Sequence, residues 1–167
     1  MPVSTAANSK TFNVSTPSDR EIRLTRLFDA PRAIVFEVLT QPEHVARWWG
    51  QLGAGYSTRA EGDVRVGGRW RYINRHPHGE VEFYGVYREI SPPERLVFTE
   101  TYAAFPDAES ICTVVLTEEH GKTRLTLTAL YDSRATRDMV LQSGMEKGAA
   151  VSYDRLEEVA KELQQRS

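Results

Sequence analysis

A single cysteine, Cys112, among 167 residues excludes a disulfide bond within one chain and is typical of a protein in a reducing compartment. No apolar run approaches the ~20 residues needed to cross a bilayer. The first twenty residues also lack the apolar core of a secretory signal. We therefore expect a cytoplasmic protein with no membrane partner.

An excess of charge is lacking as well. The formal net charge is -2, whereas proteins that bind nucleic acids or anionic membranes need a basic surface. We therefore expect no nucleic-acid partner. The length suits one domain with a sizeable core, and it leaves the oligomeric state open.

Motifs for common chemistry are also missing. The glycines of GAG (53–55) and VGG (66–68) lack the spacing of phosphate-binding loops, and no G-x-S-x-G signature is present. His76 and His78 suggest a metal site only weakly, because no carboxylate or thiol partner is evident for them. We expect no metal, no cofactor and no catalytic residue.

The N-terminal half predicts a leader, a strand and two helices. Residues 1–18 are small, polar and aperiodic, which predicts a flexible leader before a single domain over 19–167. Alternation in EIRLTRLF (21–28) predicts a strand. Asp29 is the expected cap of a helix that continues to residue 40. A second short helix is expected from Pro42 to Trp49, with Gly50 in the left-handed position after it.

From about residue 58 the apolar residues alternate with a period of two, which predicts antiparallel strands. We expect four-residue hairpin loops at 76–79, 91–94 and 119–122. These loops place the apolar and aromatic residues on one concave face and most charges on the other. The predicted cross-strand pairs are Arg75–Glu80, Tyr72–Phe83, Trp70–Gly85, Tyr87–Phe98, Gly85–Glu100, Leu116–Leu125, Val114–Leu127 and Cys112–Ala129.

From about Arg134 to the end the spacing is helical. Its apolar stripe comprises Met145, Ala149, Leu156, Val159, Ala160 and Leu163. Gly144 and Gly148 indicate either an irregular helix start or room for close packing or a ligand. The elements together predict an α+β fold, in which a curved antiparallel sheet of six to seven strands wraps around a long C-terminal helix. Two short helices close one end.

Four segments resemble a known family: RLFDAPRAIVFEVLTQPEHVARWWG, VGGRWRY, GVYREISPPERLVFT and SGMEKGAAVSYDRLEEV. They are similar to the bacterial homologues of the activator of heat-shock-protein-90 ATPase, in the START-like (SRPBCC) superfamily of helix-grip folds. The resemblance covers about 19–163. It implies a deep cavity between the sheet and the long helix, used across the superfamily for lipids, sterols, polyketides and plant hormones. Many relatives carry a tryptophan after the helix glycine, where Gly148 is followed here by Ala149 and Ala150. This departure implies that this end of the cavity is either larger or less tightly closed.

More aromatic side chains with polar tips converge on the predicted interior than a core needs, which favours a ligand pocket over a filled core. The adjacent indoles of Trp48 and Trp49 point about 100° apart on a helix, so one is expected under the helix and one at the cavity mouth. The expected ligand-binding, cavity-lining residues are Trp48, Trp49, Trp70, Tyr72, Phe83, Tyr87, Phe98, Glu100, Tyr102, Met145 and Ala149.

Glu100 allows three interpretations. A one-residue slip or bulge turns it to solvent, an internal partner satisfies it, or it acts as a pocket acid that orients a ligand or transfers a proton. Cys112, on the same face, is either a small inert core residue or a reactive thiol. Arg69, Arg71 and Arg75 form an outer stripe that either pairs with neighbouring glutamates or binds an anionic partner.

We expect a non-catalytic binding protein for a small hydrophobic or aromatic molecule. One alternative is a stress or chaperone accessory module with a protein partner. A second is an enzyme of the cyclase or hydrolase type that uses the same cavity. A chaperone role inferred from the family would rest on fold analogy alone.

Overall fold

The computed structural model describes residues 11–166, which form eight strands and four helices. The strands are β1 (Phe12–Ser15), β2 (Glu21–Phe28), β3 (Ser57–Gly62), β4 (Arg69–His76), β5 (Gly79–Ser91), β6 (Arg95–Tyr102), β7 (Ser110–Glu119) and β8 (Lys122–Leu130). The helices are α1 (Arg32–Thr40), α2 (Pro42–Trp48), α3 (Arg134–Leu141) and α4 (Met145–Arg166). None of these helices is long and apolar enough to cross a membrane.

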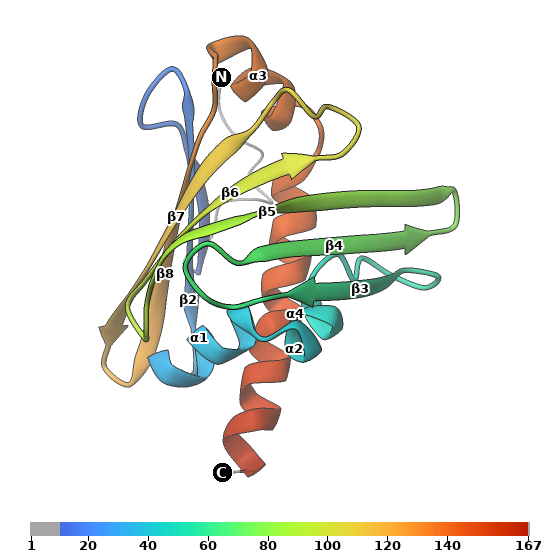
Figure 1. Ribbon diagram of the computed structural model, residues 1–167. Helices are drawn as coiled ribbons and strands as arrows, with labels where there is room; N and C mark the ends of the chain where they lie inside the picture. Colours follow the sequence, from blue (N-terminus) through green and yellow to red (C-terminus); the bar gives the residue numbers. More distant parts are fainter. Residues whose placement is uncertain (1–10, 167) are drawn as a thin grey trace.

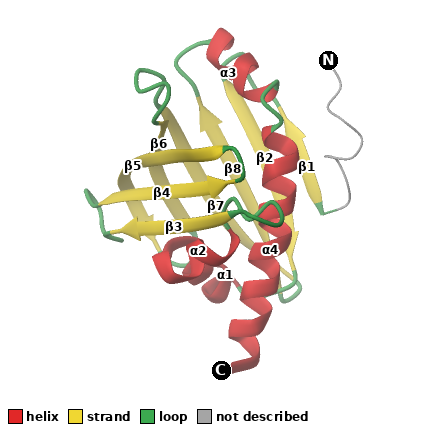
Figure 2. Ribbon diagram, turned by 90° about the vertical axis from the view of Figure 1, so that its right-hand side faces the viewer, coloured by secondary structure: helices red, strands yellow, loops and turns green. Residues whose placement is uncertain are grey.

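All eight strands form one antiparallel sheet in the order β1-β2-β8-β7-β6-β5-β4-β3. The sheet curves, and α4 crosses its concave side (Figures 1 and 2). Helices α1 and α2 lie beside one half of α4, and α3 lies at the opposite end of the molecule (Figure 2). This arrangement confirms the predicted helix-grip fold, with one strand more than the six to seven expected.

The additional strand is β1, which falls within the predicted leader of residues 1–18. Phe12 and Val14 are buried and pair with Arg26 and Leu24 of β2. Two apolar residues separated by one polar residue were enough to add an edge strand, so the leader prediction is wrong for residues 12–15. Residues 1–10 lie outside the described part of the chain.

Two hairpins have the predicted register. Arg75 lies opposite Glu80 in β4–β5, and Cys112 lies opposite Ala129 in β7–β8. The other pairs predicted for these two hairpins are also present. Pairing between the strands continues up to His76–Gly79 and Glu119–Lys122, so each hairpin loop has two unpaired residues rather than the four predicted. At the second loop, His120 and Gly121 both have positive φ, as a type I′ turn requires.

The β5–β6 hairpin differs in its loop. Ser91 pairs with Arg95, which leaves three loop residues instead of four. An irregularity between Tyr87 and Glu89 then shifts the register by one residue. The two differences cancel, so Tyr87 still lies opposite Phe98, and Glu100 remains on the interior face.

The start of α1 corrects a second detail. Its N-cap is Pro31, and no side chain caps the helix. Asp29 instead accepts a hydrogen bond from Lys161 of α4 at 2.8 Å. Helix α2 ends at Trp48, one residue earlier than predicted, and Gly50 has the predicted left-handed conformation with φ +68°.

The C-terminal helical segment is divided in two. Helix α3 ends at Leu141, and Gly144, with φ +84°, turns the chain before α4 begins at Met145. This positive φ corresponds to the irregular start that was one of the two interpretations. Gly148, by contrast, lies within α4 and has only one atom, Leu52 Cδ1 at 3.9 Å, near the position of a Cβ.

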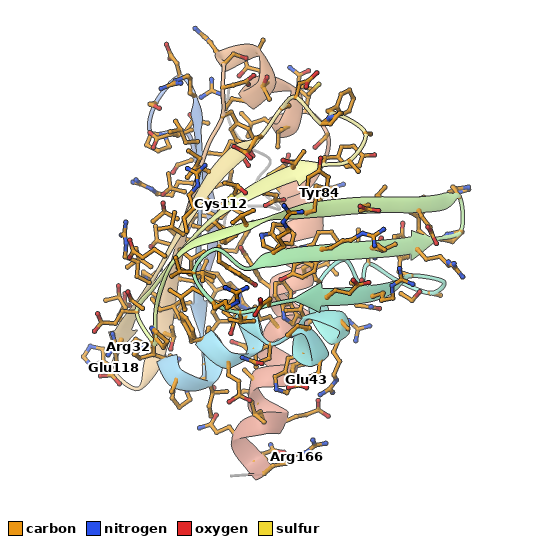
Figure 3. All side chains as sticks on the ribbon, viewed as in Figure 1. Arg32, Glu43, Tyr84, Cys112, Glu118 and Arg166 are labelled. Carbon is orange, nitrogen blue, oxygen red and sulfur yellow. The ribbon has the colours of Figure 1, made fainter. Side chains whose placement is uncertain are left out.

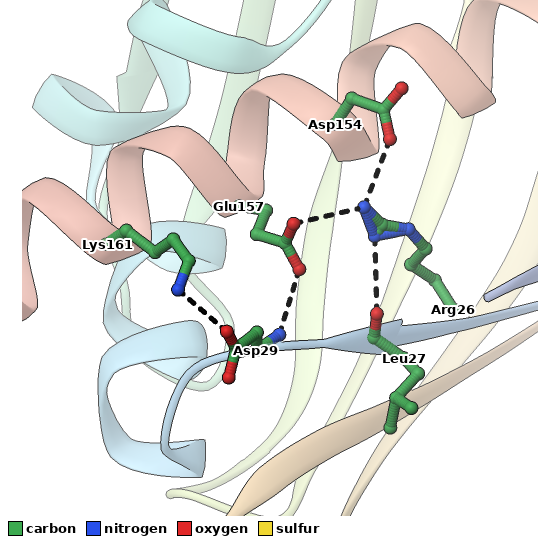
Figure 4. A network of polar contacts seen from close by, with 6 residues as sticks. All are labelled: Arg26, Leu27, Asp29, Asp154, Glu157 and Lys161. Carbon is green, nitrogen blue, oxygen red and sulfur yellow. Dashed lines mark hydrogen bonds and ion pairs between the residues drawn. The ribbon is translucent and has the colours of Figure 1, made fainter.

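A buried arginine fastens α4 to the sheet. Arg26 lies on the interior face of β2, and its guanidinium contacts Asp154 at 3.0 Å and Glu157 at 3.6 Å (Figure 4). Glu157 also accepts a hydrogen bond from the backbone N–H of Asp29 at 2.8 Å. The network fixes the axial position of α4, while its buried residues Leu156, Val159 and Ala160 supply the apolar contact.

Candidate functional site

A cavity of about 550 Å³ lies between the concave face of the sheet and α4. All eleven residues that the sequence predicted to line a cavity do line it. Further apolar residues of β2, β7 and β8 also line the cavity. Residues far apart in the sequence, from β2 to α4, therefore surround one cavity.

The two adjacent indoles have different surroundings. Trp48 is buried under α1, where its Nε1–H donates to the carbonyl of Val38 at 2.9 Å. Trp49 is only partly buried and packs its ring against Tyr72 and Phe83, at centroid distances of 5.4 and 5.2 Å. Both side chains line the cavity, but Trp48 also packs beneath α1, whereas Trp49, in extended backbone directly after α2, belongs to the aromatic wall.

The sheet supplies a continuous aromatic wall. Trp70 packs against Tyr72 and, edge to face, against Phe98, with centroids 4.6 and 5.7 Å apart. Phe83 and Tyr102 stack at 5.0 Å. Alternation in β4, β5 and β6 places these five rings on one face, and their mutual contacts hold them in place.

Glu100 lies inside this wall. It follows Phe98 and precedes Tyr102 on the interior face of β6, so the interpretation that a slip turns it to solvent is wrong. Burial raises the pKa of its carboxyl group above the ordinary value of 4.5, while a contact with Cys112 opposes this increase. That contact, from Sγ to Oε2 at 3.7 Å, is the one side-chain partner found for the carboxyl group among residues 11–166.

Glu100 is also electrostatically isolated. Among the described residues that line the cavity it is the only acid, and none is lysine, arginine or histidine. In Figure 3 the labelled charged residues Arg32, Glu43, Glu118 and Arg166 lie at the periphery, whereas Cys112 lies within the sheet on β7. The carboxyl group therefore has no counter-ion in the cavity wall.

Cys112 is a poor nucleophile in this setting. It is 2% exposed, and burial together with the charge of Glu100 raises the pKa of its thiol well above the ordinary value. The thiolate is the reactive form of cysteine, so a raised pKa suppresses reactivity. The environment favours the inert alternative.

Replacing the isolated acid should change how stability depends on pH. The unfolded chain loses the Glu100 proton near 4.5, whereas the folded protein retains it to a higher pH. As the pH rises from the pKa of the unfolded chain to that of the folded protein, the free energy of unfolding therefore decreases, by about 1.4 kcal/mol per pH unit. In Glu100→Gln we expect this decrease of the free energy of unfolding with pH to disappear, as measured by urea denaturation from pH 4.5 to 8. Glu118→Gln, an exposed change of equal charge, should keep the wild-type slope, and parallel curves for wild type and Glu100→Gln would contradict the expectation.

Exposed apolar side chains from the α2–β3 loop, the β6–β7 loop and α3 border the cavity. Leu52, Phe105 and Met139 are 42%, 50% and 45% exposed and all line the cavity. Large apolar side chains at this exposure mark an opening rather than a closed core.

Two tyrosines that line the cavity were missed by the sequence analysis. Tyr131 continues the alternation of Leu127 and Ala129 beyond the end of β8, and Tyr153 lies one helical turn after Ala149. Burial raises the pKa of both phenols, so they remain neutral. Extending both periodicities by one step would have found them.

The outer arginine stripe pairs mainly with glutamates. Arg71 contacts Glu82 at 3.0 Å, and Arg75 contacts Glu80 at 2.8 Å. This geometry favours the structural interpretation over an anionic partner. No group of three or more potential metal ligands from His, Cys, Asp and Glu occurs among residues 11–166.

Comparison with known protein families identifies one match. Residues 29–161 match the family described as Activator of Hsp90 ATPase homolog 1-like protein. None of the curated proteins searched matches the chain.

Solved structures show the same fold. Protein Ms6760 from Mycobacterium smegmatis is similar at 23% identity and a TM-score of 0.78, over 88% of this chain and 94% of that one. A protein from Rhodobacter sphaeroides has 24% identity and a TM-score of 0.80, over 87% and 95%. Protein NE0264 from Nitrosomonas europaea has 22% identity and a TM-score of 0.77, over 89% and 98%.

Proposed function

Since the chain belongs to the family of Activator of Hsp90 ATPase homolog 1-like proteins, whose START-like fold supports ligand-binding or accessory roles, we propose that it binds a small, mainly apolar molecule between the sheet and α4. The observation that carries the proposal is the cavity of about 550 Å³ with its aromatic wall. Small-molecule sites are typically apolar clefts of about 300–1,000 Å³ with a few polar groups.

Binding is a better fit than catalysis. A catalytic site needs an acid, a base or a nucleophile in complementary states. Burial keeps the Cys112 thiol and the Tyr131 and Tyr153 phenols protonated, which leaves Glu100 as the one carboxylic acid among the described lining residues, with no complementary base beside it. We propose that this carboxyl group orients the ligand.

A role as an accessory of a chaperone ATPase is the second candidate. The family description supports it, and so do the exposed apolar side chains of Leu52, Phe105 and Met139 around the cavity opening. A protein partner that uses this surface would cover the opening, so this candidate competes directly with ligand entry.

Filling the cavity tests the proposal. We expect Ala149→Trp to weaken binding of the neutral fluorescent probe N-phenyl-1-naphthylamine at least about tenfold, because the indole occupies volume next to Gly148 that is now open. Overpacking costs about 1–3 kcal/mol, so the variant should fold. Fluorescence titration gives the affinity.

Val151→Trp is the matched control. Val151 lies on the same helix, is exposed and does not line the cavity, so this variant should bind like wild type. Equal affinities for all three proteins, or no probe binding by the wild type, would contradict the proposal. Native mass spectrometry of the purified wild type should additionally reveal a co-purified small molecule.

A further inference from the structure

The polar end of the cavity is built around one uncompensated acid. Glu100 lies on β6 opposite Ser110 of β7. The groups that face it are the thiol of Cys112 from β7 and the phenols of Tyr72, Tyr131 and Tyr153 from β4, the end of β8 and α4. All four groups are neutral, so a carboxylate at this position lacks a counter-charge.

A carboxylate is seldom buried in a protein without a partner or a function. Its contact with Cys112 at 3.7 Å is a weak sulfur contact that cannot replace lost hydration. The missing interaction is one that a bound molecule would supply. The absence of lysine, arginine and histidine from the described lining makes anions, such as fatty acids or phosphate esters, unfavourable occupants.

The neighbouring rings favour a positive charge as well. Phe98 and Tyr102 flank Glu100 on the same strand face, and Trp70 packs against Phe98 at 5.7 Å. The faces of aromatic rings carry negative potential and attract cations within about 6 Å, and the attraction is strongest when water is excluded. A carboxylate among aromatic rings is the environment that binds protonated amines and quaternary ammonium groups.

We propose that the cavity selects ligands in which a cationic amine is attached to an apolar body, with the amine at Glu100 and the body against the aromatic wall. This inference rests on the proposed ligand-binding function and specifies the chemical class of the ligand. A protonated amine supplies the counter-charge that the protein omits, and the apolar body fills the remaining volume.

A matched pair of probes tests the inference. We expect 2-(1-naphthyl)ethylamine to bind the wild type at pH 7 at least about tenfold more tightly than 2-(1-naphthyl)ethanol, which has a similar shape but no charge. Glu100→Gln should abolish this preference by weakening amine binding, with the alcohol little changed. Glu118→Gln, an exposed change of the same charge on β7, should keep the wild-type preference. Isothermal titration calorimetry gives the affinities, and circular dichroism confirms folding.

Proton exchange in the wild type gives a readout that needs no variant. A cation placed at Glu100 lowers the pKa of the carboxyl group. Amine binding should therefore release protons at a pH above the ordinary value of 4.5 at which the free folded protein still retains part of this proton. The neutral alcohol removes water without adding charge and should release none. Titrations in buffers of different ionisation enthalpy measure the number of protons.

The outcomes separate this inference from the proposed function. If both probes bind with equal affinity, or if 1-naphthylacetic acid binds more tightly than the amine, the amine inference is wrong while the ligand cavity stands. If none of the three probes binds, both proposals fail. An amine preference that survives in Glu100→Gln would also overturn the assignment.

Discussion

A chain that ends at residue 133 will show no cooperative unfolding transition. This truncation removes α3 and α4, and with α4 the buried residues Tyr153, Leu156 and Val159. Burying a large apolar side chain contributes about 1.5–3 kcal/mol, and a typical domain is stable by only about 5–15 kcal/mol. The truncation also leaves Arg26 without either of its carboxylate partners inside the sheet. Thermal unfolding followed by circular dichroism checks the result.

A chain that ends at residue 163 is the matched control. It keeps every buried residue of α4 and removes residues 164–167, whose described side chains are exposed. We expect it to melt within a few degrees of the full chain. If the chain ending at 133 melts like the control, α4 is dispensable for folding and the account of the core is wrong.

Gly85→Ala should lower the free energy of unfolding by about 4 kcal/mol or more, or prevent folding. A Cβ atom at Gly85 would lie 1.8 Å from the carbonyl oxygen of Thr99 and 2.7 Å from Nε1 of Trp70. The first clash is with the backbone of β6, so a side-chain rotation cannot relieve it. The strands β5 and β6 would have to separate, which would also disturb the bond from Trp70 Nε1 to Thr99. Urea denaturation measures the loss.

Gly148→Ala is the control for this substitution. Its new methyl group would meet only Leu52 Cδ1 at 3.9 Å, an ordinary contact. Alanine is favoured over glycine inside a helix by about 0.5–1 kcal/mol, so this variant should be slightly more stable than wild type. If the two variants had equal effects, the close approach of β5 to β6 would not explain the need for glycine.

The hairpins were predictable because two local signals agree in them. In β7–β8 the alternation of Cys112, Val114 and Leu116 matches that of Leu125, Leu127 and Ala129, and the glycine turn between them fixes the register. A register error of one residue would turn every apolar side chain outward. That penalty makes the period-two pattern a reliable guide to which residues share a face.

The remaining features depend on interactions between distant segments. Alternation in β2 places Arg26 on the same buried face as Ile22 and Leu24. Its partners Asp154 and Glu157 lie on the last helix, however, so nothing local in β2 reveals them. The irregularity after Tyr87 compensates for a shorter loop, and alternation alone does not reveal such a pair of changes. Asp29 is another case, since its sequence position suggests a helix cap while the fold uses it to bind Lys161.

The sequence predicts which residues face the cavity, but it does not predict how large the cavity is. Alternation places Trp70, Tyr72, Phe83 and Glu100 on the same side of the sheet. Whether their tips meet or leave space depends on how far α4 lies from the sheet, which the sequence pattern does not encode. Phe105 and Leu52 were missed for a related reason, because both lie in loops where no periodicity applies.

The position of β2 in the sheet constrains when the fold can form. On one side β2 pairs with β8, where Ile22 lies opposite Ala129. This edge of β2 therefore cannot pair until Ala129 has been synthesised. At about 5–20 residues per second on the ribosome, the intervening ~100 residues take about 5–20 s to synthesise. The consecutive hairpins from β4 to β8 have short-range contacts and can pair as they emerge, whereas the pairing of β2 is long-range and slow. During that interval the alternating strand β2 exposes an unpaired apolar edge, which makes the nascent chain most prone to aggregation before β8 is complete.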